Sequence, residues 1–262
     1  MHKLPIYQVD AFADRPFTGN PAAVVPLHSW LPAAVMQAVA AENNLSETAF
    51  FAPEGAGYRI RWFTPTLEVD LCGHATLASA FIILTELQPG LSAVGFESRS
   101  GHLSVSRDGE LFCLDFPSRP PERVAPVPGL AAALGVEVAE TWQARDLIAV
   151  LASEDAVRGL QPDMAALSGI EAFSVVATAA GRSVDFVSRC FAPKEGIPED
   201  PVTGSTHCSL APFWAGRLGR TKLHARQLSA RGGELFCELQ GARVKIAGRA
   251  VKFSSGWFLI PE

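Results

Sequence analysis

The sequence predicts an α+β protein of two pseudo-symmetric domains, and two observations support this. The first is an internal repeat: the segment DLCGHATLA at 70–78 is echoed by DPVTGSTHCSLA at 200–211, and GELFC occurs at both 109–113 and 233–237. A repeat of roughly 125 residues is far longer than a solenoid period. The second is that each half has many short strands and one long helix, without βαβ alternation. We therefore expect domains at residues 1–118 and 119–262, with a ligand site between them.

The bulk composition indicates a globular protein and excludes several partners. The chain has 262 residues, 48% of them hydrophobic, and a net charge of −5. There is no block of Lys and Arg, so we expect no binding to nucleic acid or to a membrane surface. The five cysteines form no C-x-x-C or zinc pattern. Free thiols and an N-terminus without a secretory signal predict a cytoplasmic location.

The first elements follow from alternation, helical spacing and breakers. Strands are expected at 6–12 and 22–26, separated by a loop. Ser29 can cap a helix with Pro32 in its first turn, and Asn43 and Asn44 end that helix. The runs 47–52 and 58–63 then predict a pair of strands around a turn.

The rest of the first half is expected to hold a buried helix and a meander. A turn formed by Cys72, Gly73 and His74 is followed by an apolar helix. This helix runs to about Leu87 and is stopped by Pro89 and Gly90. Asp-Gly at 108–109 is a hairpin signal between the last two expected strands. Those strands lie at 96–98, 101–107 and 111–116. The proline-rich segment 117–128 is the expected linker.

The second half repeats this order less clearly. A helix should start near Ser205 and end before Gly216, with Pro212 able to kink it. Short helices are expected at 128–134 and 162–167, and strands at 146–151, 173–177, 184–190, 228–229, 235–239, 242–247 and 256–260.

Both repeated turns place a glycine where a strand leads into a helix. A helix N-terminus presents unpaired backbone N–H groups and the positive end of the helix dipole, which suits a carboxylate. Gly73 and Gly204 are therefore candidate carboxylate-binding turns. The alternative is ordinary capping by Ser205 and Thr206.

His74 and Cys72 flank the first glycine. An imidazole can exchange a proton near neutral pH, and a helix N-terminus should lower the pKa of His74 and favour its neutral form. The same dipole can lower the pKa of the Cys72 thiol and make it a possible secondary base. The matching position in the second turn is Thr203, so a mechanism with two thiols lacks its second base.

Two carboxylates are candidates for the chemistry. Glu47 enters the apolar run TAFF, where partial desolvation suits a general acid/base; alternatively it is the last solvent-facing residue before the strand, or it caps a local turn. Asp200 precedes Pro201 on extended backbone and could bond a substrate amine or hydroxyl; alternatively it only forms a turn.

Together these segments resemble the phenazine-biosynthesis PhzF-like family, which has the diaminopimelate epimerase-like fold. The resemblance runs over nearly the whole chain. It is carried by QVDAF at 8–12, FTGNPAAVV at 17–25, NLSETAF at 44–50, DLCGHAT at 70–76 and EDPVTGS at 199–205.

The resemblance implies a barrel-like sheet around a central helix in each domain, no cofactor, no metal and a homodimer. It implies proton transfer within a substrate such as trans-2,3-dihydro-3-hydroxyanthranilate. Glu47 would be the acid/base, and His74 and Asp200 would hold polar groups of the substrate. The remaining substrate-binding candidates are Asn20, Ser46, Gly73, Gly204 and Ser205.

The sequence therefore predicts a cofactor-independent isomerase that shifts a proton on a small carboxylate-bearing substrate. One alternative is an amino-acid epimerase or racemase that uses Cys72. Another is a small-molecule binding protein that keeps the fold without turnover. Thr203 argues against a two-cysteine racemase.

Overall fold

The computed structural model describes residues 2–260, and the chain divides into two compact units. The first unit runs to Asp115 and includes the segment from Ala247 on; the second is Phe116–Ile246. The chain passes from the first unit to the second between Asp115 and Phe116, close to the expected boundary after residue 118. The assignment of the C-terminal segment differs, because the last strand pairs with the first one along its whole length.

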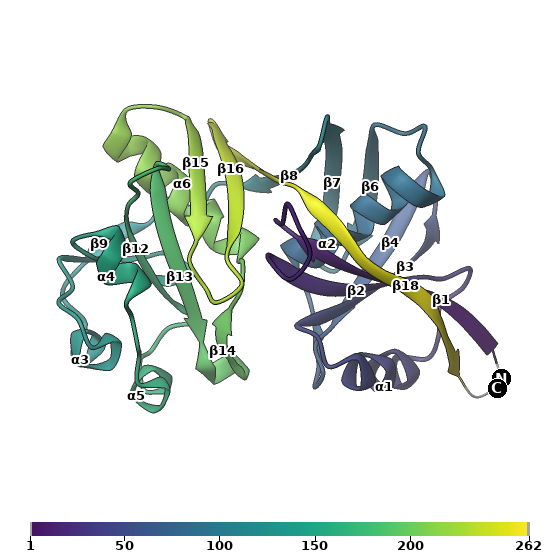
Figure 1. Ribbon diagram of the computed structural model, residues 1–262, viewed down its shortest axis with the longest axis horizontal. Coiled ribbons are helices and arrows are strands. Elements are labelled where there is room, and N and C mark those ends of the chain that lie inside the picture. Colours follow the sequence, from purple (N-terminus) through teal and green to yellow (C-terminus); the bar gives the residue numbers. More distant parts are fainter. Residues whose placement is uncertain (1, 261–262) are drawn as a thin grey trace. The chain divides into compact units, whose positions relative to one another are not determined.

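The first unit is a β-sheet around one buried helix (Figure 1). Strands β1 and β2 are antiparallel, β2 and β3 parallel, β3 and β4 antiparallel, β4 and β6 parallel, and β6, β7 and β8 antiparallel in turn. The strand bounds are β1 His2–Ala11, β2 Asn20–Pro26, β3 Glu47–Glu54, β4 Gly57–Phe63, β5 Glu68–Val69, β6 Ala93–Ser98, β7 Gly101–Asp108, β8 Leu111–Pro117 and β18 Ala250–Ile260.

The helices of this unit end where the sequence supplies a break. Helix α1 (Ala33–Asn43) ends at Asn44, which adopts the left-handed conformation with φ 47°. Its N-cap is Pro32 and not Ser29, so the predicted serine cap is wrong; the fixed φ of proline starts this helix. Helix α2 (Gly73–Ile82) continues as a π-helical turn, η1 (Ile83–Leu87), to the predicted end.

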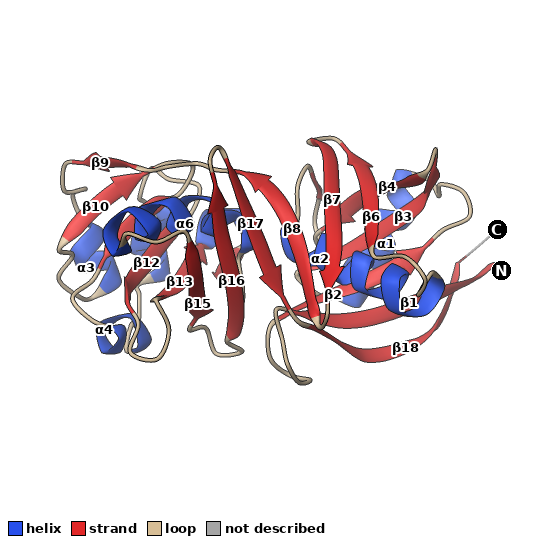
Figure 2. Ribbon diagram, turned by 90° about the horizontal axis from the view of Figure 1, so that it is seen from above, coloured by secondary structure: helices blue, strands red, loops and turns tan. Residues whose placement is uncertain are grey.

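The second unit repeats the same pairing order. Strands β10 and β11 are antiparallel, β11 and β12 parallel, β12 and β13 antiparallel, β13 and β15 parallel, and β15 and β16 antiparallel. The pseudo-symmetric α+β fold is thus confirmed at the level of strand topology (Figure 2). The bounds are β9 Glu122–Val124, β10 Glu140–Gln143, β11 Leu147–Val150, β12 Val175–Ala180, β13 Phe186–Ala192, β14 Ile197–Asp200, β15 Lys222–Gln227, β16 Gly233–Gln240 and β17 Arg243–Gly248.

Helix α6 (Gly204–Leu218) is the counterpart of α2 and carries Pro212 inside it. The shorter helices are α3 (Leu130–Leu134), α4 (Glu154–Arg158), α5 (Met164–Ser168) and the 3-10 turn η2 (Pro193–Glu195). The proline-rich segment expected as a linker contains β9, which pairs with β10 and extends the sheet.

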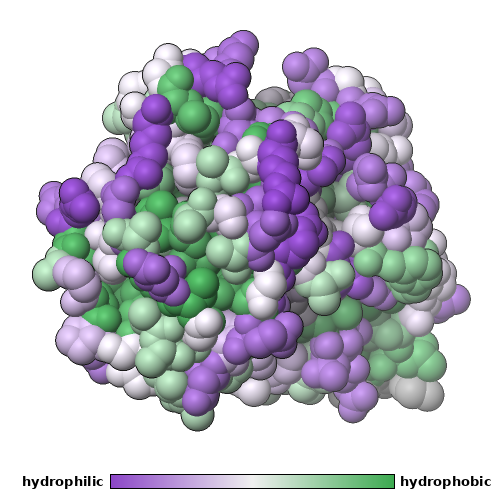
Figure 3. Space-filling model, turned by 60° about the vertical axis from the view of Figure 1, so that its left-hand side comes forward, coloured by the Kyte–Doolittle hydropathy of each residue, from purple (hydrophilic) through white to green (hydrophobic). Residues whose placement is uncertain are grey.

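Each unit has its own apolar core. In the first, Val25, Met36 and Phe50 belong to a cluster between α1 and the sheet. In the second, Leu134, Val157 and Phe191 belong to a cluster under the short helices. Figure 3 shows one face of the molecule as a mixture of hydrophilic and hydrophobic residues, as is usual for a globular protein. No helix within residues 2–260 is long and apolar enough to cross a membrane.

Candidate active site

Glu47 is the first residue of β3, and the sheet fixes its position. Its backbone is in register with Ala22 of β2 on one side, and the strand continues into a fully buried apolar run. The residue is 8% exposed, so the interpretation of Glu47 as a solvent-facing end of the strand is wrong. A carboxylate at this depth needs a positively charged or hydrogen-bonding partner.

The first glycine turn provides that partner. Cys72 is the N-cap of α2 with extended backbone, φ −141° and ψ 109°, and its side chain makes no capping hydrogen bond. Thr76 bonds back one turn, its Oγ1 donating to the Cys72 carbonyl at 2.5 Å. His74 lies in the first turn of the helix, 5% exposed. The helix start therefore carries two buried reactive side chains.

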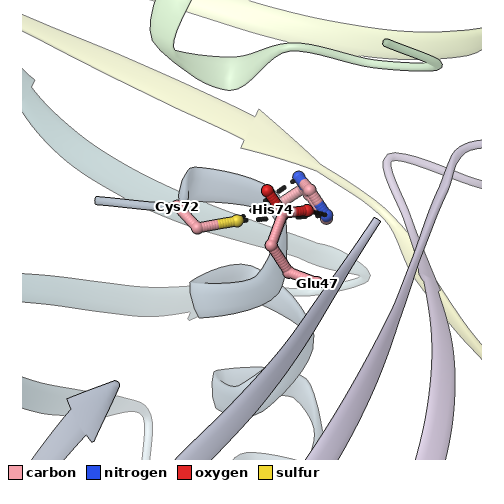
Figure 4. A group of neighbouring side chains, drawn as sticks. All are labelled: Glu47, Cys72 and His74. Atoms are coloured by element: carbon pink, nitrogen blue, oxygen red, sulfur yellow. Dashed lines mark hydrogen bonds and ion pairs between the residues drawn. The ribbon is translucent and has the colours of Figure 1, made fainter. Parts of the chain in front are cut away.

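Glu47, Cys72 and His74 point toward one another (Figure 4). His74 Nε2 lies 3.0 Å from Glu47 Oε2, and Cys72 Sγ lies 3.6 Å from Nδ1 and 3.9 Å from Nε2 of the same ring. Oε2 accepts no well-aligned hydrogen bond, so its contact with Nε2 is an ion pair. The three side chains form a single carboxylate–imidazole–thiol cluster, called here the proton-transfer cluster.

Burial keeps the Cys72 thiol protonated. Loss of hydration and, next, the charge of Glu47 raise the pKa of Cys72 to about 11, against the smaller lowering effect of His74. The expectation that the helix dipole lowers the pKa of this thiol is therefore wrong. Desolvation and a neighbouring carboxylate both oppose a thiolate, and together they decide the direction of the shift.

The imidazole of His74, unlike the thiol of Cys72, is held in its charged form. Burial lowers the pKa of His74, but the charges and hydrogen bonds of Cys72 and Glu47 raise it more, so the net pKa lies well above its usual value. Because Cys72 stays protonated, we assign this effect to the Glu47 carboxylate. The expectation of a neutral imidazole kept so by the helix dipole is wrong. The ion pair with Glu47 holds a proton on His74.

Asn20 contacts the cluster from β2. It is fully buried, and its Nδ2 lies 3.2 Å from His74 Nδ1. Gly19 brings the chain into this position: its φ is +67°, and a Cβ there would lie 2.2 Å from the Ala11 carbonyl oxygen. The Gly-Asn pair of the FTGNP segment thus has a steric reason, and Asn20 orients the imidazole from the side away from Glu47.

The second turn has the same backbone but different chemistry. Thr203 is the N-cap of α6, again extended, and Gly204 begins the helix. Thr203 Oγ1 donates to Asp200 Oδ2 at 2.5 Å. Thr206 Oγ1 donates back to the Thr203 carbonyl at 3.0 Å, so the alternative that Ser205 and Thr206 cap the helix is wrong.

Gln227, at the end of β15, holds this second turn. Its Oε1 accepts from the Thr203 backbone N–H at 2.9 Å, and its Nε2 donates to the Asp200 carbonyl at 2.7 Å and to Thr203 Oγ1 at 3.1 Å. Sequence reasoning missed Gln227. Its strand was expected only from residue 228, and no local motif links it to the turn.

The structure thus brings Asn20, Glu47, Cys72 and His74 together in the first unit, with Gly73 between the last two and Ser46 directly before Glu47. Asp200, Gly204 and Ser205 lie on the second turn, in the second unit. With this fold and a buried carboxylate–imidazole pair at a glycine turn, the chain falls in a class of α+β proteins whose relatives are named as isomerases.

Comparison with known proteins narrows the class to a family. The sequence profile of the phenazine biosynthesis-like proteins matches residues 9–256, so the chain belongs to that family. An uncharacterized isomerase of Pseudomonas aeruginosa is 51% identical over 254 residues, covering 97% of this chain and 98% of the relative.

Solved structures agree. A PhzF-family protein of Enterococcus faecalis has a TM-score of 0.97 and 49% identity, covering 99% of this chain and 100% of that one. A predicted epimerase of Pseudomonas aeruginosa has a TM-score of 0.76 at 22% identity, covering 98% and 100%, and shares the fold.

Proposed function

We propose that this protein is a cofactor-independent isomerase that moves a proton on a small carboxylate-bearing substrate, with Glu47 as general acid/base. The observation that carries the proposal is the buried ion pair between Glu47 Oε2 and His74 Nε2 at 3.0 Å. This pair places a carboxylate oxygen, the usual kind of proton acceptor, beside a cationic imidazole in a site shielded from water.

The proposed reaction uses the two groups in sequence. Glu47 takes a proton from a carbon of the substrate, and His74 stabilises negative charge that develops on the substrate. Glu47 then returns the proton to a different position. The surroundings exclude water, since both side chains are about nine-tenths buried, and electrostatic interactions strengthen in such a site.

The alternative that Cys72 is the base has less support. A base must be deprotonated to act, and burial raises the pKa of this thiol to about 11. At neutral pH the thiolate fraction would be on the order of one in ten thousand. Glu47 Oε2 lies beside His74 in the same cluster, so we propose Glu47 as the residue that moves the proton.

Glu47→Gln is the direct test. Solvent-deuterium incorporation would first be screened by mass spectrometry over a panel of small carboxylic acids that includes trans-2,3-dihydro-3-hydroxyanthranilate and amino acids. With a substrate so identified, Glu47→Gln is expected to lower turnover by roughly 10²–10⁴-fold, the usual range for a general acid/base. Turnover near the wild-type rate in Glu47→Gln would reject the proposal.

The same strand provides a matched control. Glu54 ends β3 as Glu47 begins it, but Glu54 is exposed and pairs with Arg59 at 2.6 Å. Glu54→Gln should leave turnover unchanged. A similar loss in both variants would show that the substitution acts through the strand and not through proton transfer.

Asp200, Gly204, Ser205, Asn20 and Ser46 are proposed substrate-binding residues. For Ser205→Ala we expect KM to rise about tenfold with little change in kcat, the effect of losing one hydrogen bond to a charged group. An unchanged KM would remove Ser205 from the set. The proposal also includes a homodimer in the cytoplasm, and light scattering of the purified protein tests the dimer.

A further inference from the structure

We propose that the proton-transfer cluster is also a binding site for a thiophilic divalent cation of the zinc class, held by Cys72 Sγ, His74 Nε2 and Glu47 Oε2. Within residues 2–260, these three side chains form a group whose ligand atoms all lie within 4.8 Å of one another. The cation would act as a reversible blocker of the cluster and not as a cofactor. It uses the side chains of the proposed function but does not depend on turnover.

The separations match a tetrahedral ion. With Zn–S near 2.3 Å and Zn–N or Zn–O near 2.0–2.2 Å, two ligands at a tetrahedral angle lie about 3.3–3.6 Å apart. The observed separations from His74 Nε2 are 3.9 Å to Cys72 Sγ and 3.0 Å to Glu47 Oε2. The two distances from Nε2 differ from this range by a few tenths of an ångström, and the Sγ–Oε2 separation lies within 4.8 Å, so side-chain rotations can bring all three atoms to one ion.

The unsatisfied carboxylate oxygen of Glu47 supports the same position for the cation. Glu47 Oε2 lies 3.0 Å from Nε2, yet it accepts no well-aligned hydrogen bond although the residue is more than nine-tenths buried. An oxygen so placed has a lone pair directed away from the line to the imidazole. A cation between Oε2, Nε2 and Sγ would satisfy that lone pair and, on binding, would displace the protons of the thiol and of Nε2 to solvent.

Asn20 completes the arrangement expected around a metal-binding histidine. Such a histidine usually donates its other ring N–H to a nearby acceptor, which fixes the ring. Asn20 lies 3.2 Å from His74 Nδ1, the nitrogen that the proposed ion leaves free. A rotation of the amide by 180° presents its oxygen to an Nδ1–H.

The donor set selects the cation. One thiolate, one imidazole and one carboxylate match three-ligand zinc sites, in which a fourth position is left for water or another ligand. Mg²⁺ and Ca²⁺ prefer oxygen ligands and should not compete. We therefore expect binding of Zn²⁺ and Cd²⁺ and no binding of Mg²⁺ at equal concentration.

Cd²⁺ titration of the reduced full-length protein tests the site. Wild type should bind one equivalent with thiolate-to-cadmium charge-transfer absorption in the ultraviolet. Cys72→Ser should lose that absorption, whereas Cys113→Ser, which removes another cysteine of the same unit, should keep it. Asn20→Ala should weaken binding about 10–100-fold. Equal absorption and affinity in wild type and Cys72→Ser would overturn the proposal.

A second measurement needs no variant, in case Cys72→Ser fails to fold. Saturating Zn²⁺ should slow alkylation of Cys72 more than tenfold, measured on its peptide by mass spectrometry, and leave alkylation of Cys113 unchanged. Equal rates of Cys72 alkylation with and without Zn²⁺ would reject the site.

The two proposals can fail separately. Normal turnover in Glu47→Gln with intact metal binding in wild type would reject only the proton-transfer mechanism. Loss of turnover in Glu47→Gln without any metal binding in wild type would reject only the cation site.

Discussion

The two glycine turns share one backbone design and differ in the charge of their histidines. At each, an extended N-cap precedes a glycine, and a side chain one helical turn later bonds back to the N-cap carbonyl: Thr76 to Cys72, and His207 to Thr203. In the first unit a carboxylate lies beside the imidazole of His74. In the second, β12 begins with Val175 where β3 begins with Glu47, each being the first residue paired to the neighbouring parallel strand.

The consequence is that two buried histidines have opposite protonation. Burial lowers the pKa of His207 to about 4, partly offset by its bond to the Thr203 carbonyl, and its ring lies against Phe186. His74 is almost equally buried, but its pKa is raised well above the usual value. Burial alone therefore does not decide the charge. The neighbouring Glu47 carboxylate gives His74 its charge.

The largest expected difference between the turns is in catalysis. His74→Gln removes the cationic partner of Glu47 and should lower turnover by at least about 100-fold, the low end for an acid/base group. His207→Gln alters only a buried hydrogen bond and should leave kcat within a few-fold of wild type. Steady-state kinetics on the screened substrate measures both. Equal losses would show that the turns do not differ in function.

A second difference is in the pH dependence of stability through His207. Since its folded pKa is about 4 and its unfolded pKa about 6.5, the unfolded chain binds a proton first as pH falls. Stability should therefore drop between pH 6.5 and 4, by up to about 3 kcal/mol. Urea unfolding across this range should show the drop in wild type and a smaller one in His207→Gln.

His74 should act in the opposite direction. Because its folded pKa is raised, its contribution to stability is complete below pH 6.5 and is lost as pH rises through the folded pKa. The difference in unfolding free energy between wild type and His74→Gln should therefore shrink at alkaline pH. Nitrogen shifts in NMR should show a protonated His74 and a neutral His207 at pH 7. A neutral His74 would contradict the assigned ion pair.

Substitutions of Gln227 test how much the second turn contributes to stability. Gln227→Ala removes three hydrogen bonds from the turn and should cost about 2–3 kcal/mol of unfolding free energy. Gln227→Glu would place a buried carboxylate against the Asp200 carbonyl without a positive partner, so at neutral pH it should destabilise the protein more than alanine does. Urea denaturation checks the order, and a harmless Gln227→Ala would contradict a structural role for this amide.

The smallest effect on stability should come from the hydrogen bond that Thr76 Oγ1 donates to the Cys72 carbonyl in the first turn. Thr76→Val preserves the shape of the side chain but removes the hydroxyl that donates to the Cys72 carbonyl. We expect a loss of about 1 kcal/mol in unfolding free energy. Thr85→Val, which removes a similar back-bond at 2.6 Å outside the cluster, is the matched control and should show a loss of the same size.

Local signals predicted much of this structure. The paired strands β3 and β4, the left-handed stop at Asn44 and the two glycine turns all depend on neighbours in sequence, so pattern and propensity suffice. The Ser29 cap failed because proline can start a helix without a side-chain cap. The strand β9 was not predicted because it lies in a proline-rich segment that was expected to be a linker. Its pairing with β10 depends on tertiary contact.

The pKa shifts of Cys72 and His74 could not be predicted from their neighbours in sequence. Cys72 and His74 stand at a helix N-terminus, and the dipole is the only charge effect that the local sequence reveals. Burial, and next Glu47 from β3, raises the pKa of Cys72, and the Glu47 carboxylate raises the pKa of His74; both shifts oppose the expected direction. Gln227 was missed for the same reason: its contacts with Thr203 and Asp200 bridge segments distant in sequence.

The return of β18 to the first unit has a consequence for biosynthesis. His2 is in register with Ile260, so the sheet that begins with β1 is completed by a strand that is synthesised after the whole second unit. The second unit is one continuous segment, Phe116–Ile246. Domains usually fold in the order of their translation. Here the unit made second can finish first, while the unit that carries Glu47 and His74 waits until β18 has been synthesised.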